Sequence, residues 1–397
     1  MTKNIEFTFF FRPMALLFLA MILSPPAMGQ VKVVDSKGIG IAREDALQDA
    51  LRNAVGQAAG VTVASQTVVE NFLILKDAIA TNSKGYITGY EITGETKTTD
   101  GYEVYVTASV SLEPLEADAG LLARQIGGLR FLVMFNKKKI GREMADEMEF
   151  AVNAINNYLA SEHYRYIEKS RLDRLQEEAF LIMEDTDTSE MSFIQKLGIM
   201  SGAQFIILID DIMAEEKSEN FDTRKSTRVR VQVKAYDNCT AEGLGTAVLE
   251  SDWVPGSTTD LSKGISGAVE NDIGDLMALF NSYIGSWINN GTPYELRFYQ
   301  VGTFRDFRDL RNSIRESPDF GGQMEITSLN NYTKLNATFK SLPDDVAFDI
   351  LDYADAIPGF ADKTLDVLFI YGRQISFAPR DVVVPEIEKN IELIDEN

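Results

Sequence analysis

The chain has 397 residues, of which 45% are hydrophobic and 25% charged, and its formal net charge is −22. This length exceeds one ordinary domain, so two or three domains are expected. So acidic a surface repels phosphate backbones and argues against nucleic acid as a partner, although the acidity could also serve solubility alone. Cys239 is the only cysteine and His163 the only histidine, which excludes an intramolecular disulfide, a histidine-centred triad and a multi-histidine metal site.

Residues 1–29 have the layout of a secretory signal. Lys3 and Arg12 give a positive start, residues 14–23 form a short apolar core, and small residues precede a cleavage point after Gly29. An uncleaved amphipathic anchor is the alternative. Because Gln30 and not cysteine follows the expected cut, we expect no lipid at the mature N-terminus. No other stretch is long and apolar enough to span a membrane, so a periplasmic protein is predicted.

The first domain is expected over residues 30–118. Alanines recur at every fourth position from Ala42 to Ala58, which predicts a helix with a flat stripe of small residues that ends at Gly60. Strands are expected at residues 61–69, 86–97 and 102–112, and Asp100-Gly101 is typical of a hairpin turn between the last two.

A short lead strand, "AREDALQDALRNAV", "GYITGYEI" and "YEVYVTASVSL" follow one another in this domain. In that order they resemble the N-terminal domain of the flagellar H-ring assembly protein T and of related small outer-membrane proteins. An anonymous α+β domain is the alternative.

The middle domain is expected over residues 119–291 as an α/β unit with a mixed sheet. The elements expected in chain order are a strand at 130–135, a helix at 142–160, a strand at 164–167, a helix capped by Ser170, a helix at 190–200, a buried strand at 205–209, a polar loop at 215–225, an antiparallel hairpin over 229–235 and 246–253, and a helix at 261–288.

Three ordered segments of the middle domain carry a second resemblance: "EKSRLDRLQEE" at 168–178, "GAQFII" at 202–207 and the turn "DNCTAEG" at 237–243. They resemble the curli-secretion lipoprotein G family, the outer-membrane activators of penicillin-binding proteins, and the N-terminal domain of TolB. The chain departs from the curli lipoproteins because it lacks the lipid-bearing cysteine and a pair of long amphipathic membrane hairpins. A pore through the outer membrane is therefore not expected.

The third domain is expected over residues 292–377, followed by an acidic tail at 378–397. Strand, helix, two strands, helix and strand follow in the order βαββαβ, which predicts a ferredoxin-like fold. This fold does not determine function. An RNA-binding module is disfavoured because the strands lack the aromatic signature of such modules and the charge is wrong. For the tail we expect a strand at most, and then disorder.

Few residues are candidates for chemistry. Asp210 and Asp211 follow the apolar run at 205–209, where the carboxyl end of a strand could hold Mg²⁺ or Ca²⁺, but a solvated strand end is the plainer interpretation. The basic run 137–139 could bind an anion or form a solvated turn. We expect His163 on the surface and Cys239 as an incidental thiol in a turn.

The sequence thus predicts a three-domain fold in which a central α/β domain is flanked by an α+β domain and a ferredoxin-like one. The resemblances imply a non-enzymatic periplasmic scaffold or assembly factor associated with the outer membrane. Such a protein would have other envelope proteins as partners, could form a homo-oligomeric ring, and would need no cofactor. The alternatives are a module that activates a peptidoglycan synthase and, more remotely, a metal-dependent enzyme using Asp210 and Asp211.

Overall fold

The structure is a computed structural model of the chain, and it contains three units, each built around its own sheet. The residues that it describes are 30–66, 78–80, 82–99, 101–115, 117–118, 122, 129–136, 144–168, 198, 201–218, 225–255, 261–328 and 332–382. The predicted multi-domain fold of α/β and α+β type is confirmed. The signal segment, the basic run 137–139 and most of "EKSRLDRLQEE" lie outside the described residues.

The first unit is an antiparallel three-stranded sheet with one long helix on one face. Its elements are β1 (Val31–Gly40), α2 (Arg43–Gln66), the 3-10 turn η1 (Ser83–Gly85), β2 (Ile87–Lys97) and β3 (Tyr102–Ser111). The strand order is β1-β3-β2. The strand predicted at 102–112 is confirmed, and its alternate residues Val104, Val106, Ala108 and Val110 are all buried.

The alanine stripe of α2 is what lets the helix lie close to the sheet. Ala46, Ala50, Ala54 and Ala58 are fully buried, and the Ser36 hydroxyl on β1 donates a 2.7 Å hydrogen bond to the Ala50 carbonyl oxygen. Side chains no larger than a methyl group bring the two backbones together.

The helix α2 does not end at Gly60, as the sequence predicted, but continues to Gln66. The strand predicted at 61–69 is therefore wrong for residues 61–66, and residues 67–69 lie outside the described part. A glycine inside a helix costs about 1 kcal/mol relative to alanine, and β-branched residues only slightly disfavour helix. Both local preferences are small enough for the packing of α2 to override them.

The middle unit is a mixed sheet covered on one face by two helices. Its elements are β4 (Phe131–Phe135), α5 (Ala145–Ser161), β5 (Phe205–Ser218), β6 (Lys225–Asp237), β7 (Glu242–Glu250), the short β8 (Val254–Pro255) and α8 (Ser262–Asn290). The order is β4-β5-β6-β7, with β4 and β5 parallel and the other pairs antiparallel. Phe131, Phe205 and Phe280 pack with ring centroids 5.1–5.5 Å apart at the centre of its core.

Two predicted connections of the middle unit differ from the structure. The short strand expected at 164–167 is reduced to a single bridge between Phe131 and Tyr166. The polar stretch expected as a loop at 215–225 lies partly inside a hairpin, because β5 runs to Ser218 and β6 begins at Lys225. Ion pairs across the strands, such as Lys225 with Glu216 at 2.7 Å, stabilise polar residues on an open sheet face.

The third unit is a five-stranded sheet packed against helices. Its elements are β9 (Thr292–Tyr299), α9 (Phe304–Glu316), β10 (Phe320–Ser328), β11 (Tyr332–Phe339), α10 (Pro343–Asp355), α11 (Pro358–Ala361), β12 (Leu365–Tyr371) and β13 (Gln374–Pro379). A capping box between Thr303 and Asp306 begins α9.

The third unit departs from the predicted ferredoxin-like order at its last strand. The sheet order is β10-β11-β9-β13-β12, so β12, which was predicted to close the fold, lies at the edge. The chain turns after β12, and β13 takes the place beside β9, to which it is parallel. The strand β13 includes Ala378 and Pro379, two residues that the sequence placed in the tail, and residues 383–397 lie outside the described part.

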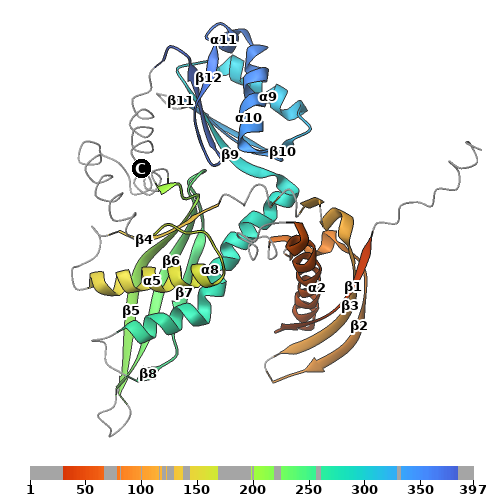
Figure 1. Ribbon diagram of the computed structural model, residues 1–397, viewed down its shortest axis with the longest axis vertical. Coiled ribbons are helices and arrows are strands. Elements are labelled where there is room, and N and C mark those ends of the chain that lie inside the picture. The colour runs from red at the N-terminus through yellow and green to blue at the C-terminus, as the bar shows by residue number, and fades with distance from the viewer. Residues whose placement is uncertain are drawn as a thin grey trace, which may run out of the picture.

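The helix α8 connects the units. Figure 1 shows it crossing the middle unit and ending where the first and third units approach it. One continuous cluster of buried apolar side chains runs from the first unit into the middle unit, whereas the third unit has a core of its own. Within the described residues, every helix is too short or too polar to cross a membrane.

Candidate functional site

The two predicted metal ligands, Asp210 and Asp211, do not lie at a strand end. The strand β5 continues through them to Ser218, and the register with β6 shifts between Ile209 and Asp211, as at a β-bulge. Lys234 Nζ on β6 lies 2.9 Å from Asp210 Oδ2. The Asp211 carboxylate accepts a hydrogen bond from the backbone N–H of Ile212. The carboxylates therefore have protein partners in the middle of the sheet.

Asp210 belongs to a row of ion pairs on the sheet face opposite α8. Arg228 and Arg230 on β6 both pair with Glu250 on β7, and Arg230 also pairs with Glu215 on β5. Among the described residues, no three histidine, cysteine, aspartate or glutamate side chains lie close enough together to hold a metal ion.

We expect Asp210→Asn to cost at most about 1 kcal/mol of unfolding free energy, because its pair with Lys234 is about one third exposed. Calorimetric titration of the unmodified protein with Mg²⁺ or Ca²⁺ is expected to give no binding heat. Binding heat that disappears in Asp210→Asn would restore the metal hypothesis.

His163 and Cys239 lie in turns, but their surroundings differ. His163 is exposed in the turn after α5, as predicted, and has a positive φ of 59°. Cys239 is fully buried in the turn between β6 and β7, and burial raises the pKa of its thiol to about 12. A thiol with so high a pKa is almost entirely protonated at neutral pH, which makes it a poor nucleophile.

The third unit contacts the middle unit beside Cys239, through the turn between β12 and β13. Arg373, in this turn, donates from Nη2 to Asp237 Oδ1 at 2.7 Å, and the two side chains are 5% and 0% exposed. The hydroxyl of Tyr283 on α8 donates to the other carboxylate oxygen of Asp237 at 2.6 Å. We call this set the interdomain ion pair, because Asp237 belongs to the middle unit and Arg373 to the third.

Several further contacts hold Arg373 in place. Its guanidinium carbon lies 4.6 Å from the centroid of the Trp287 ring, and Nη1 donates to the Pro293 carbonyl oxygen at 3.0 Å. Burial acts to lower the pKa of Arg373, but the interactions with Asp237, Cys239 and Tyr283 together outweigh it, and the pKa is raised well above its usual value. Arg373 therefore stays charged, and its charge is balanced inside the protein.

The β12–β13 turn fits closely against the middle unit. The Tyr371 hydroxyl donates to the Ala203 carbonyl oxygen and accepts a 3.2 Å hydrogen bond from the Asn238 side chain. A Cβ atom added to Gly372 would lie 2.8 Å from Cys239 Sγ. These contacts hold the β12–β13 turn directly against the middle unit and keep the two units in one orientation.

The sequence itself contains a signal for one member of this pair. Arg373 is a single charged residue within the apolar run "LFIYGRQISFA", and a charge in such a place is rarely buried without a partner. The partner, 136 residues earlier in the chain, could not be identified from spacing.

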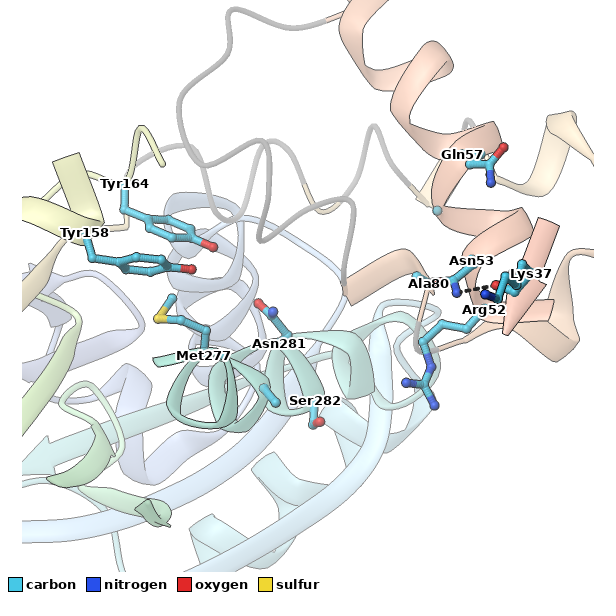
Figure 2. Close-up of a pocket in the computed structure, with 13 residues that line it drawn as sticks. Lys37, Arg52, Asn53, Gln57, Ala80, Tyr158, Tyr164, Met277, Asn281 and Ser282 are labelled. Carbon is cyan, nitrogen blue, oxygen red and sulfur yellow. Dashed lines mark hydrogen bonds between the residues drawn. The ribbon is translucent and has the colours of Figure 1, made fainter. Parts of the chain in front are cut away.

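A cavity of about 850 Å³ lies between the first and middle units. It is lined by Lys37, Arg52, Asn53, Gly56, Gln57, Ala80, Tyr158, Tyr164, Gly274, Met277, Ala278, Asn281 and Ser282. Figure 2 shows the hydroxyls of Tyr158 and Tyr164 directed toward Met277 and Asn281 on α8, with Arg52 reaching from α2 on the other side. Sequence reasoning named none of these residues as a site.

The outer face of the first sheet is the second feature that sequence reasoning missed. Val33 and Ile39 on β1 are 65% and 60% exposed, and Val31, Ile41 and Tyr105 are also exposed. Figure 1 shows α2 on the side of the sheet nearer the other units, so this face points away from them. We call Val31, Val33, Ile39, Ile41 and Tyr105 the outer apolar face.

The free edge of β1 is partly closed by α2. Asp49 accepts a 3.0 Å hydrogen bond from the Ile39 backbone N–H, and Asn53 donates at 2.9 Å to the Lys37 carbonyl oxygen. These backbone groups are therefore not available to a strand from another chain. Contacts through the face of this sheet are favoured over addition of a strand at this part of its edge.

Comparison with known proteins gives only distant similarity. No family model matches the chain, and no curated protein is significantly similar to it. Similar solved structures include the C-terminal domain of LpoB from Salmonella enterica, with 12% identity, a TM-score of 0.21, and coverage of 34% of this chain and 93% of that chain. Lipoprotein GNA1162 from Neisseria meningitidis has 14% identity, a TM-score of 0.24, and coverage of 37% and 99%. The hypothetical protein CT253 from Chlamydia trachomatis has 15% identity, a TM-score of 0.24, and coverage of 41% and 97%.

These values are too low to assign an activity or a partner to this chain. The resemblances to the flagellar, curli and TolB proteins are not tested by them and stay predictions.

Proposed function

We propose that this chain is a non-enzymatic docking protein of the bacterial cell envelope, which binds a partner protein on the outer apolar face of its first sheet. The observation that carries the proposal is the exposure of Val31 and Val33 at the start of β1 and of Ile39 and Ile41 at and just after its end, on either side of Asp35 and Lys37. Apolar side chains grouped on a surface are typical of protein interaction sites, whereas scattered ones need no explanation.

The polar groups of the same face suit an interface rather than a core. Lys37 Nζ pairs with Glu103 at 2.8 Å, and the Thr107 hydroxyl donates to Asp35. These groups are satisfied within the sheet, so a partner can cover them without leaving an unpaired charge.

The rest of the proposal comes from the sequence. The signal layout of residues 1–29 supports export, and the resemblances to envelope-assembly proteins support a periplasmic scaffold that associates with the outer membrane and assembles into a ring. Activation of a peptidoglycan synthase is the second candidate, because it too requires a docking face. A metal-dependent enzyme is not favoured, since Asp210 is paired with Lys234.

We expect the double substitution Val33→Asp and Ile39→Asp to abolish capture of the partner from intact envelopes, because it places two charges on the outer apolar face. The melting temperature is expected to change little, since both side chains are more than half exposed. A pull-down with quantitative mass spectrometry measures the capture.

Val248→Asp on β7 is the matched control, since Val248 is 46% exposed on another unit and receives the same chemical change. A partner retained equally by all three proteins would contradict docking on the outer apolar face. The identity of a lost partner separates an assembly machine from a peptidoglycan synthase. The mass of the protein in native membranes tests ring formation.

A further inference from the structure

The cavity between the first and middle units has a buried polar floor and an open rim. Tyr164 and Asn281, both nearly buried, lie with the apolar Met277 at the floor. Arg52 and Ser282 are exposed at the rim. The volume of about 850 Å³ lies within the range of small-molecule sites, roughly 300–1,000 Å³.

The charge of the cavity is opposite to that of the protein. Its described lining includes Arg52 but no aspartate or glutamate, in a chain whose net charge is −22. The ammonium group of Lys37, the other basic residue of the lining, pairs with Glu103 on the outer face of the sheet and adds no charge to the cavity. Arg52 is held only loosely, because its nearest acid, Asp49, lies 3.9 Å away, and the Arg52 side chain is 55% exposed. The carboxylate of Asp49 already accepts the Ile39 backbone N–H. Arg52 therefore has donors available for an anion.

The neutral part of the lining suits a ligand rich in hydroxyl groups. The amides of Gln57 and Asn281 and the hydroxyls of Tyr158 and Ser282 are groups that can both donate and accept hydrogen bonds. The Asn53 amide nitrogen already donates to the Lys37 carbonyl oxygen and to Asp49, so Asn53 offers its oxygen as an acceptor. The apolar part of the lining consists of Met277, two alanines, two glycines and the rings of Tyr158 and Tyr164, whose hydroxyls make this wall polar as well as apolar. A metal cation would need carboxylates.

We propose that this cavity binds an acidic saccharide, with the carboxylate of the sugar on Arg52 and its hydroxyls on the amide and hydroxyl side chains of α2, α5 and α8. Arginine can bind a carboxylate through two parallel hydrogen bonds. The site should therefore bind an acidic sugar more tightly than the neutral sugar of the same structure. The inference does not rest on the outer apolar face, which lies on the opposite side of the first sheet.

A substitution on the exposed face of α8 can fill the cavity without changing the core. Gly274, Ala278 and Ser282 are one turn apart, exposed, and line the cavity. A Cβ atom added to Gly274 would meet nothing within 4 Å. Gly274→Phe therefore fills the cavity, and it also removes a glycine from a helix interior.

Calorimetric titration of the purified protein with cellobiouronic acid, cellobiose and acetate tests the proposal. Cellobiouronic acid is expected to bind about tenfold more tightly than cellobiose, because the two differ in one carboxylate that Arg52 holds. Acetate alone is expected not to compete. Arg52→Gln should reduce the affinity for the acidic sugar to that for the neutral one, and Gly274→Phe should abolish both.

Arg43→Gln is the matched control, because Arg43 lies on the same helix but pairs with Glu95, a residue outside the cavity lining. Equal loss in Arg43→Gln and Arg52→Gln, equal binding of both sugars, competition by acetate, or no binding of either sugar would each overturn the proposal. Should Gly274→Phe lower the melting temperature, the comparison of the two arginine variants decides the question by itself.

Discussion

Replacing Arg373 by methionine is expected to lower the free energy of unfolding by about 3–5 kcal/mol, the usual cost of removing one partner from a buried ion pair. The physical reason is that Asp237, which is fully buried, would keep its charge without a cation beside it. Urea unfolding followed by circular dichroism measures the loss. Because the pair joins two units, we also expect the third unit to separate from the middle one before either unfolds.

The rate at which Cys239 is alkylated measures that separation directly. Cys239 is the only thiol, it is fully buried, and the turn that carries Arg373 covers it. In the unmodified protein, alkylation of Cys239 is expected to be slow, because burial keeps the thiol protonated. In Arg373→Met it should become much faster at urea concentrations below the main transition.

The matched control is Arg380→Met, just beyond β13. Arg380 pairs with Asp366 at 3.0 Å, but the two side chains are 73% and 40% exposed, so this change should cost less than about 1 kcal/mol. The double variant Asp237→Asn with Arg373→Met should recover part of the loss, since no charge is then left buried. Equal effects of the two arginine substitutions would show that the interdomain ion pair does not join the units.

Gly38→Ala is expected to destabilise the first unit by about 3 kcal/mol, at the upper end of the usual cost of overpacking. The added Cβ atom would lie 2.1 Å from the Ala50 nitrogen and 2.2 Å from the Ala46 carbonyl oxygen. Both are backbone atoms of α2, so no side chain can rotate away, and the helix must move off the sheet. Thermal unfolding followed by circular dichroism measures the effect.

Gly89→Ala is the control, in the same sheet and with the same change, because its Cβ atom would meet nothing within 4 Å. It should be neutral or slightly stabilising, since alanine restricts the unfolded chain more than glycine does. If both substitutions cost the same, the close approach of β1 and α2 does not limit the stability of the first unit.

Local patterns in the sequence predicted the elements that bury one regular face. The alternation of Val229, Val231, Val233 and Ala235 predicted β6, and all four side chains are buried. The apolar spacing from Met144 to Leu159 predicted α5, which begins at Ala145. Such patterns are reliable because the periods of 2 and 3.6 residues follow from backbone geometry alone.

Predictions that depended on local chemistry at element ends were less accurate. Gly60 does not stop α2, and Asp210 does not end β5. Glycine in a helix and carboxylates in a strand cost little, and packing of the whole element or a lysine on the next strand offsets that cost. The candidate metal site was predicted at the end of a strand. Because β5 continues to Ser218, Asp210 and Asp211 lie within the strand instead.

By itself, the sequence determined the three-unit composition, the buried faces of most helices and strands, and the absence of an intramolecular disulfide or a multi-histidine site. Only the tertiary structure decided that β13 lies parallel to β9, that Arg373 pairs with Asp237, and that α2 and α8 enclose a cavity. The first group follows from periods and counts that each segment carries within itself. The second joins residues far apart in the chain, and their contact depends on how whole sheets and helices pack, which no local pattern encodes.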